Sequence, residues 1–209
     1  MQFIDTHAHT YDEAFQGDLD ATISSAQEAR IGKILMPNID VESIEPMFAI
    51  QEKYPNCIPM MGLHPAYVKG DWEKQLEKIE SYLFADPERF CAIGEIGMDL
   101  YWDKTYIEEQ KIAFIQQIQW AKKLDLPIAI HARDAFNEIF EILDKENDTR
   151  QAIAKRYLAE IKNEKIILPT WDLSGNHVFH LFVVRTSERD RLQSYLKQNN
   201  IEIERILIL

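Results

Sequence analysis

Histidines and carboxylates recur near the ends of the apolar segments of this 209-residue chain. His7 and His9 directly follow a short apolar run. Alternate residues of an extended chain point to the same side, so both imidazoles can face one point in space. Histidine is the commonest neutral metal ligand, and a His-x-His pair at a strand end is a preformed chelate. The pair therefore predicts a metal site whose other ligands lie elsewhere in the chain.

Two later segments supply candidates for those ligands. Glu95 ends an apolar run between glycines, whose small size leaves the carboxylate room to bridge two ions. His131 ends another apolar run, and Arg133 follows on the same side if the chain is extended. We predict that one or two divalent ions (Zn, Mg or Mn) bind to four side chains: His7, His9, Glu95 and His131. A metal-activated water would then serve as a nucleophile near neutral pH.

Other polar residues near these segments are candidates for contact with a substrate. His64 is placed to hydrogen-bond a substrate or a group that supports the metal ligands. Arg133 either clamps a phosphate or pairs with a neighbouring carboxylate. We therefore predict Glu95, His64 and Arg133 as the catalytic set. Asp99, Tyr101 and Trp102 follow Glu95 in the sequence. These side chains either face a substrate or pack within their own loop.

The first two thirds of the chain alternates between short apolar runs and amphipathic helical patterns. Strands are predicted at residues 2–5, 33–37, 58–62, 90–95 and 127–131, and helices at 18–30, 44–54, 72–84, 106–124 and 135–145. This alternation predicts a parallel sheet of βαβ units, either a closed barrel or an open doubly wound sheet. Polar residues at the ends of several strands favour a (β/α) barrel, because such ends ring one pocket. An open sheet would be expected to begin with a Gly-rich phosphate turn, and this chain has none there.

The pattern changes after about residue 147. A charged helix is predicted at residues 150–162, a strand at 178–185, a polar helix near 188–199 and a final apolar run at 201–209. We therefore predict an α/β fold in two parts. Residues 1–148 form a partial TIM-type barrel of about five βα units, and residues 149–209 form a small α+β tail.

Composition limits the classes of function. The formal net charge of −12 argues against a broad basic face that grips nucleic acid, but bound divalent ions would still allow contact with phosphates. No apolar stretch approaches the roughly 20 residues that cross a bilayer, and no secretory signal is visible. Cys57 and Cys91 lie in apolar segments without a CxxC spacing. They are expected to be buried free thiols, which favours a reducing cytoplasm.

Four of these segments closely resemble motifs of the TatD family of metal-dependent deoxyribonucleases. The matching segments are residues 5–9 (DTHAH), 62–65 (GLHP), 94–99 (GEIGMD) and 130–133 (IHAR). Four helical positions before the last motif also match: Gln110, Phe114, Gln117 and Ala121. The resemblance extends over about residues 1–148.

The resemblance implies a divalent-metal hydrolase of phosphodiester bonds that acts on DNA. It implies that His7 and His9 bind one metal, that Glu95 bridges two, and that His131 binds the second. The family also has a ligand histidine after the sixth strand and a ligand aspartate after the eighth, in segments that this sequence does not show. Impaired activity is therefore one expectation, and a metal-binding remnant without turnover is an alternative.

The tail resembles a different family. Residues 153–158 and 175–185 look like part of the small domain of DegT-type sugar aminotransferases, without the domain that carries their cofactor lysine. A sugar-nucleotide-binding module is therefore the third alternative for function. A barrel of about five units would leave two sheet edges exposed, which predicts self-association.

Overall fold

The structure is a computed structural model, and it describes residues 2–173, 177, 179 and 181–201. The chain folds into two compact units, residues 1–140 and residues 141–209. Within the described ranges, no helix is both long and apolar enough to cross a membrane.

The first unit is built on five parallel strands, which lie side by side in chain order. The strands are β1 (Phe3–Asp5), β2 (Ile31–Met36), β3 (Cys57–Pro59), β4 (Ile93–Asp99) and β5 (Ile128–Arg133). β1, β2 and β3 form one hydrogen-bonded group and β4 and β5 form another, and a parallel bridge between Met61 and Ile93 joins them. The layer is not closed into a barrel, because β1 and β5 each pair with only one neighbouring strand in the described part of the chain.

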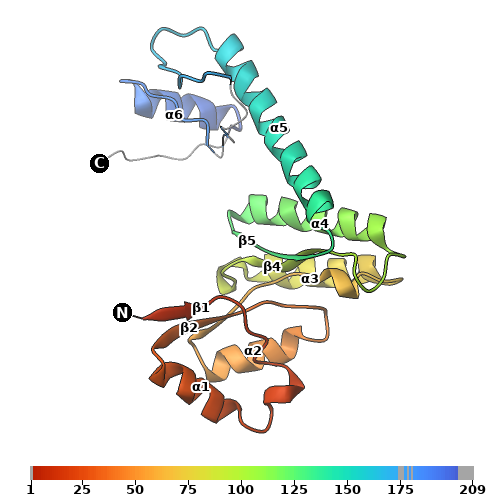
Figure 1. The fold of residues 1–209 in the computed structure, drawn as a ribbon. Coiled ribbons are helices and arrows are strands. Elements are labelled where there is room, and N and C mark those ends of the chain that lie inside the picture. Colours follow the sequence, from red (N-terminus) through yellow and green to blue (C-terminus); the bar gives the residue numbers. More distant parts are fainter. Residues whose placement is uncertain (1, 174–176, 178, 180, 202–209) are drawn as a thin grey trace. The chain divides into compact units, whose positions relative to one another are not determined.

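Four helices connect these strands and pack against them (Figure 1). They are α1 (Leu19–Glu28), α2 (Ile44–Lys53), α3 (Trp72–Ala85) and α4 (Ile107–Leu124), with short 3-10 turns at Glu13–Phe15, Pro65–Tyr67 and Pro87–Arg89. Helix α3 illustrates why they form, because its buried residues Leu76, Ile79 and Leu83 recur at helical spacing. The predicted alternation of strands and helices is confirmed up to β5.

Strand β4 extends further than the sequence predicted. The prediction ended the strand at Glu95, but Glu95 is the third residue of a strand that continues to Asp99. The pairing with β5 contains a bulge, because Ile93 is paired with Ile128 whereas Ile96 is paired with Ile130. The extra residue on β4 places Glu95 within this irregularity, and bulges commonly redirect a side chain beside a functional site.

Two buried glutamines on α4 hold the backbone of the strand ends. The amide of Gln117 accepts a hydrogen bond from the N–H of Leu63 (2.6 Å) and donates one to its carbonyl (3.2 Å). Gln110 makes the same pair of bonds with the backbone of Asp99, at 2.9 and 3.1 Å. Each amide therefore acts like a short strand partner for a backbone that would otherwise be buried without one. In this way α4 fixes the segments that carry His64 and Asp99.

The second unit differs from its prediction in two places. The helices predicted at residues 135–145 and 150–162 are one helix, α5 (Phe136–Glu160), because nothing between its ends breaks a helix: it contains neither proline nor glycine. The strand predicted at 178–185 is not observed in residues 181–184; Arg185 makes only an isolated antiparallel bridge to Ile167, and residues 178 and 180 lie outside the described residues. The polar helix is present as α6 (Arg189–Gln198), and the apolar run beyond residue 201 also lies outside the described residues. The predicted boundary at residue 148 falls within α5 and stays a prediction.

The close approach of β4 and β5 at Gly97 yields a test of this packing. Gly97 has a φ of 137°, and an added Cβ would overlap the carbonyl oxygen of His131. Gly97→Ala should therefore lower the free energy of unfolding by roughly 2–4 kcal/mol, measured by urea denaturation, because it combines a strained backbone with a clash. Gly17→Ala is the matched control, since no atom lies within 4 Å of its added Cβ. Equal effects of the two substitutions would contradict the observed register.

Candidate metal centre

The segment after β1 is held so that two imidazoles face inward together. The backbone N–H of His7 donates a hydrogen bond to Asp5 Oδ1 (3.1 Å), which turns the chain at the strand end. The N–H of Ala8 then donates to the carbonyl of Leu35 on β2 (3.0 Å). His7 and His9 flank Ala8, so this backbone bond fixes the stretch of main chain from which both rings project.

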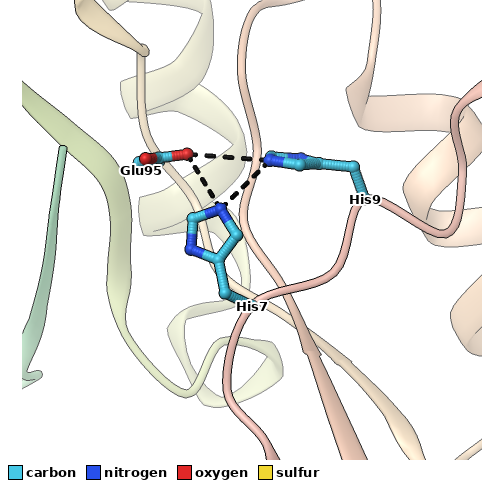
Figure 2. Close-up of side chains that lie close together, drawn as sticks. All are labelled: His7, His9 and Glu95. Carbon is cyan, nitrogen blue, oxygen red and sulfur yellow. Dashed lines mark hydrogen bonds and ion pairs between the residues drawn. The ribbon is translucent and has the colours of Figure 1, made fainter.

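His7 and His9 meet the carboxylate of Glu95, as Figure 2 shows. The Nε2 atoms of the two histidines lie 3.2 Å apart, and they lie 3.2 and 3.6 Å from Glu95 Oε2. Ligand atoms about 2.0–2.2 Å from a tetrahedral metal are separated by about 3.3–3.6 Å. The three donor atoms are therefore spaced as a single divalent ion requires. The His7 side chain is 46% exposed, so a further ligand can approach from solvent.

The hydrogen bonds of His9 leave its inward nitrogen free to bind a metal. The hydroxyl of Tyr11 donates to the carbonyl of Pro37 (2.5 Å), so it accepts a hydrogen bond from Nδ1 of His9 (2.8 Å). With the proton on Nδ1, the lone pair of Nε2 points toward His7 and Glu95. Burial, followed by the charge of Asp40, raises the pKa of Tyr11 well above its usual range, so the hydroxyl keeps its proton. The chain thus selects the tautomer that a metal ligand needs.

Glu95 is the residue that both groups of histidines share. Its backbone N–H donates to the carbonyl of Asn38 (3.0 Å), and its side chain is only 8% exposed. Oε2 faces His7 and His9, while Oε1 lies 3.1 Å from Nδ1 of His131. Oε1 therefore faces His131 and Oε2 faces the other imidazoles, which is the arrangement of a carboxylate that bridges two ions.

The electrostatic environment keeps Glu95 ionised. Burial opposes ionisation, but the surrounding imidazoles of His131, His9, His64 and His7 outweigh it. Together they hold the pKa of Glu95 well below its usual range. A buried carboxylate in this state requires nearby positive charge, which a proton on His131 or a metal ion can provide.

His131 is oriented by Asp99. Its Nε2 lies 2.9 Å from Asp99 Oδ2 and donates a proton to it, which leaves Nδ1 facing Glu95. The hydrogen bond with Glu95 raises the pKa of His131 despite its burial, and the bond with Asp99 adds to the effect. A carboxylate behind an imidazole in this way fixes the ring and raises its basicity as a ligand.

His64 also carries its proton on Nε2, but in this ring Nε2 is the nitrogen that faces the centre. Its Nδ1 accepts a hydrogen bond from the N–H of Ala66 (3.1 Å), so the neutral ring carries its proton on Nε2. That nitrogen lies 3.1 Å from His131 Nδ1 and 3.9 Å from Glu95 Oε2. Burial and the charge of His131 lower the pKa of His64 to about 4, so the ring is neutral near pH 7. His64 therefore presents a hydrogen-bond donor to the centre rather than a lone pair.

The structure brings five of the six predicted side chains together in two overlapping groups. One contains His7, His9 and Glu95, and the other contains His64, Glu95 and His131. The sixth, Arg133, lies with its guanidinium carbon 3.9 Å from the centre of the Tyr101 ring. The roles that we assigned to these residues stay predictions.

Sequence reasoning missed two supporting residues. Tyr11 was not considered, although its position two residues beyond His9 was a usable signal. Asp99 was considered only for contact with a substrate or for loop packing, whereas its carboxylate contacts His131.

Comparison with known proteins relates the chain to proteins described as metal-dependent hydrolases. A family model described as TatD related DNase matches residues 4–207. The metal-dependent hydrolase YjjV of Escherichia coli (strain K12), described as uncharacterized, is 30% identical over 161 residues, which are 77% of this chain and 62% of that protein. Its crystal structure superposes with a TM-score of 0.65, covering 75% of this chain and 64% of that one.

Two further relatives agree with this assignment. The metal-dependent hydrolase YabD of Bacillus subtilis (strain 168), also described as uncharacterized, is 34% identical over 142 residues, covering 68% of this chain and 55% of that protein. The 3'-5' ssDNA/RNA exonuclease TatD of Escherichia coli (strain K12) is 28% identical over 130 residues, covering 62% of this chain and 49% of that protein. The chain thus matches between about half and three fifths of the length of these relatives.

The role of Tyr11 can be tested by metal binding. Tyr11→Phe removes the hydroxyl that accepts from His9, so the tautomer of His9 is no longer fixed. We expect the affinity for Zn²⁺ or Mn²⁺ to fall by about tenfold or more, measured by titration against a competing chelator. Tyr82→Phe is the control, because it also loses a hydroxyl hydrogen bond, to Glu45, but on the surface of α3. An unchanged metal affinity in Tyr11→Phe would contradict the role of Tyr11 in fixing the tautomer of His9.

Proposed function

The chain belongs to the family of TatD related DNases, and from this membership we propose that it is a divalent-metal-dependent hydrolase of phosphodiester bonds in DNA. The observation that carries the proposal is the carboxylate of Glu95, whose two oxygens face two different sets of imidazoles. Two metal-binding half-sites that share one buried carboxylate suit the displacement of an oxygen at phosphorus.

The residues of the centre divide the binding of one or two ions between them. His7, His9 and Oε2 of Glu95 would hold the first ion, and Oε1 of Glu95 with Nδ1 of His131 would contribute to a second. A bound divalent ion supplies a Lewis acid that lowers the pKa of water and stabilises charge on phosphoryl oxygens. Imidazole nitrogen with carboxylate oxygen suits Zn²⁺ and Mn²⁺, and Mg²⁺ remains a candidate because of the carboxylate.

The remaining side chains act on the substrate. His64 would donate its Nε2–H to a phosphate oxygen, and its lowered pKa keeps it neutral so that it does not repel the ion. Arg133 follows His131 on β5 and would add positive charge for a phosphate. This local charge matters because the chain as a whole carries −12 and would otherwise repel nucleic acid. The relative named as a 3'-5' ssDNA/RNA exonuclease supports a nucleic acid as the substrate.

Three other predictions accompany this function. The similarity of the tail to sugar aminotransferases and a cytoplasmic location both stay predictions, the latter supported by the free thiols of Cys57 and Cys91.

Self-association gains support from the two edge strands, since β1 exposes Phe3 and Ile4 and β5 exposes Ile130. Sedimentation velocity of the full chain should reveal a dimer or larger species, and a monomer at all concentrations would contradict it.

The proposed function is tested by chelation, reconstitution and one isosteric substitution. The chain stripped of metal with EDTA should not cleave a labelled single-stranded oligodeoxynucleotide, and addition of Mn²⁺ or Zn²⁺ should restore cleavage. Glu95→Gln should lower kcat/KM by roughly a hundredfold or more, because the amide cannot bridge two cations. Glu52→Gln, an exposed carboxylate on α2, is the matched control and should cleave normally.

Two outcomes would separate the alternatives. Cleavage that is insensitive to EDTA would contradict the proposal. The metal-binding remnant would be supported instead by two results together. Calorimetry would show stoichiometric metal binding by His7, His9 and Glu95 that is lost in Glu95→Gln, and no cleavage would occur under any condition.

A further inference from the structure

Two exposed aromatic rings and an arginine form a cluster beside the candidate metal centre. Tyr101 and Trp102 follow β4 and are 52% and 72% exposed. Their rings meet edge to face, with centroids 4.7 Å apart and planes at 89°. The guanidinium carbon of Arg133 lies 3.9 Å from the centre of the Tyr101 ring and 4.9 Å from that of Trp102. We call these three residues the aromatic platform.

The platform is tied to the centre through a single carboxylate. Asp99 Oδ1 accepts a hydrogen bond from the N–H of Tyr101 (3.1 Å), while Asp99 Oδ2 contacts Nε2 of His131 (2.9 Å). The N–H of Leu100 also donates to the carbonyl of Arg133 (2.9 Å), and Arg133 lies two residues beyond His131 on the same strand. The position of the platform relative to His131 is therefore fixed by bonds at both of its ends.

The exposure of the rings points to a function beyond packing. An aromatic ring that serves only to pack is usually covered, because each ring can remove a large apolar area from water. Here the arginine covers part of the rings and leaves more than half of each in solvent. An aromatic face beside a cation, next to a site for phosphodiester chemistry, matches what an unpaired nucleobase and its phosphate require.

We propose that the aromatic platform stacks an unpaired base of a single-stranded nucleic acid and so positions the neighbouring phosphodiester at the metal centre. This inference rests on the proposed function, since it assumes a nucleic-acid substrate. Stacking requires an accessible base face, and both faces of a base inside a duplex are covered by its neighbours. The platform therefore selects single strands over duplexes.

The test compares two oligomers that carry equal numbers of phosphates. One is a labelled oligothymidine, and the other is a labelled oligomer of tetrahydrofuran abasic residues. Affinity is measured by fluorescence anisotropy with the full chain in Ca²⁺, with the integrity of each oligomer checked on a gel. The wild type should bind oligothymidine about tenfold or more tightly than the abasic oligomer, which is the effect of one or two stacked bases.

The variants separate stacking from charge. Tyr101→Ala with Trp102→Ala should bring the ratio of the two affinities close to one and leave the abasic affinity unchanged. Trp102→Phe should keep most of the preference, because a ring remains. Arg133→Lys should lower the preference for oligothymidine, since the planar group is lost. Tyr195→Ala removes a ring that is 62% exposed on α6 in the other unit and should change nothing.

The failure of this inference is distinct from the failure of the proposed hydrolase. A ratio near one in the wild type, or a ratio that the double alanine variant does not change, overturns the platform even if the chain cleaves DNA. A ratio that collapses as expected supports the platform even if no metal restores cleavage.

Discussion

The structure depends on one buried carboxylate that cannot remain without positive partners. Glu95 is almost fully covered, yet its surroundings hold it ionised, so its two oxygens require cationic or proton-donating groups on both sides. Oxygen Oε2 is met from the N-terminal segment by His7 and His9, and Oε1 is met from β5 by His131. The contacts of Glu95 therefore connect the segment after β1, the first strand of the unit, with β5, the last. The two groups of strands are also joined by the bridge between Met61 and Ile93.

Hydrogen bonds one step removed from the centre decide what each imidazole can do there. Tyr11 and Asp99 take the outer protons of His9 and His131, which turns the inner nitrogens into lone-pair donors. In His64 the outer nitrogen instead accepts a hydrogen bond from the backbone N–H of Ala66. The inner nitrogen of His64 therefore carries the proton and is a hydrogen-bond donor. Three chemically identical rings therefore acquire two different roles from the partners of their outer nitrogens.

The convergence of His7, His9, His64, Glu95 and His131 could be predicted from the sequence, because parallel strands bring their carboxyl ends to one edge. The position of Glu95 inside β4 could not, because its bulge is defined only by the register with β5. Hydrophobic periodicity also does not reveal which residues of α4 are buried. Ile115 is 40% exposed, whereas the polar Gln110 and Gln117 are buried. Their burial is favourable only because each amide meets both backbone groups of one residue, and no pattern along the helix reveals such partners.

Helix α4 connects this packing to the chemistry of the centre. Its two glutamines lie seven residues apart, so they share one face of the helix two turns apart. One amide fixes the backbone of Leu63, next to His64, and the other fixes the backbone of Asp99, which orients His131. The same rigid helix thus holds His64, which donates a hydrogen bond, and His131, which offers a lone pair. The helical repeat sets the distance between the two backbone segments that α4 holds. All the residues that form the centre and its supports therefore lie in one compact unit, residues 1–140, whose own packing determines the geometry of the site.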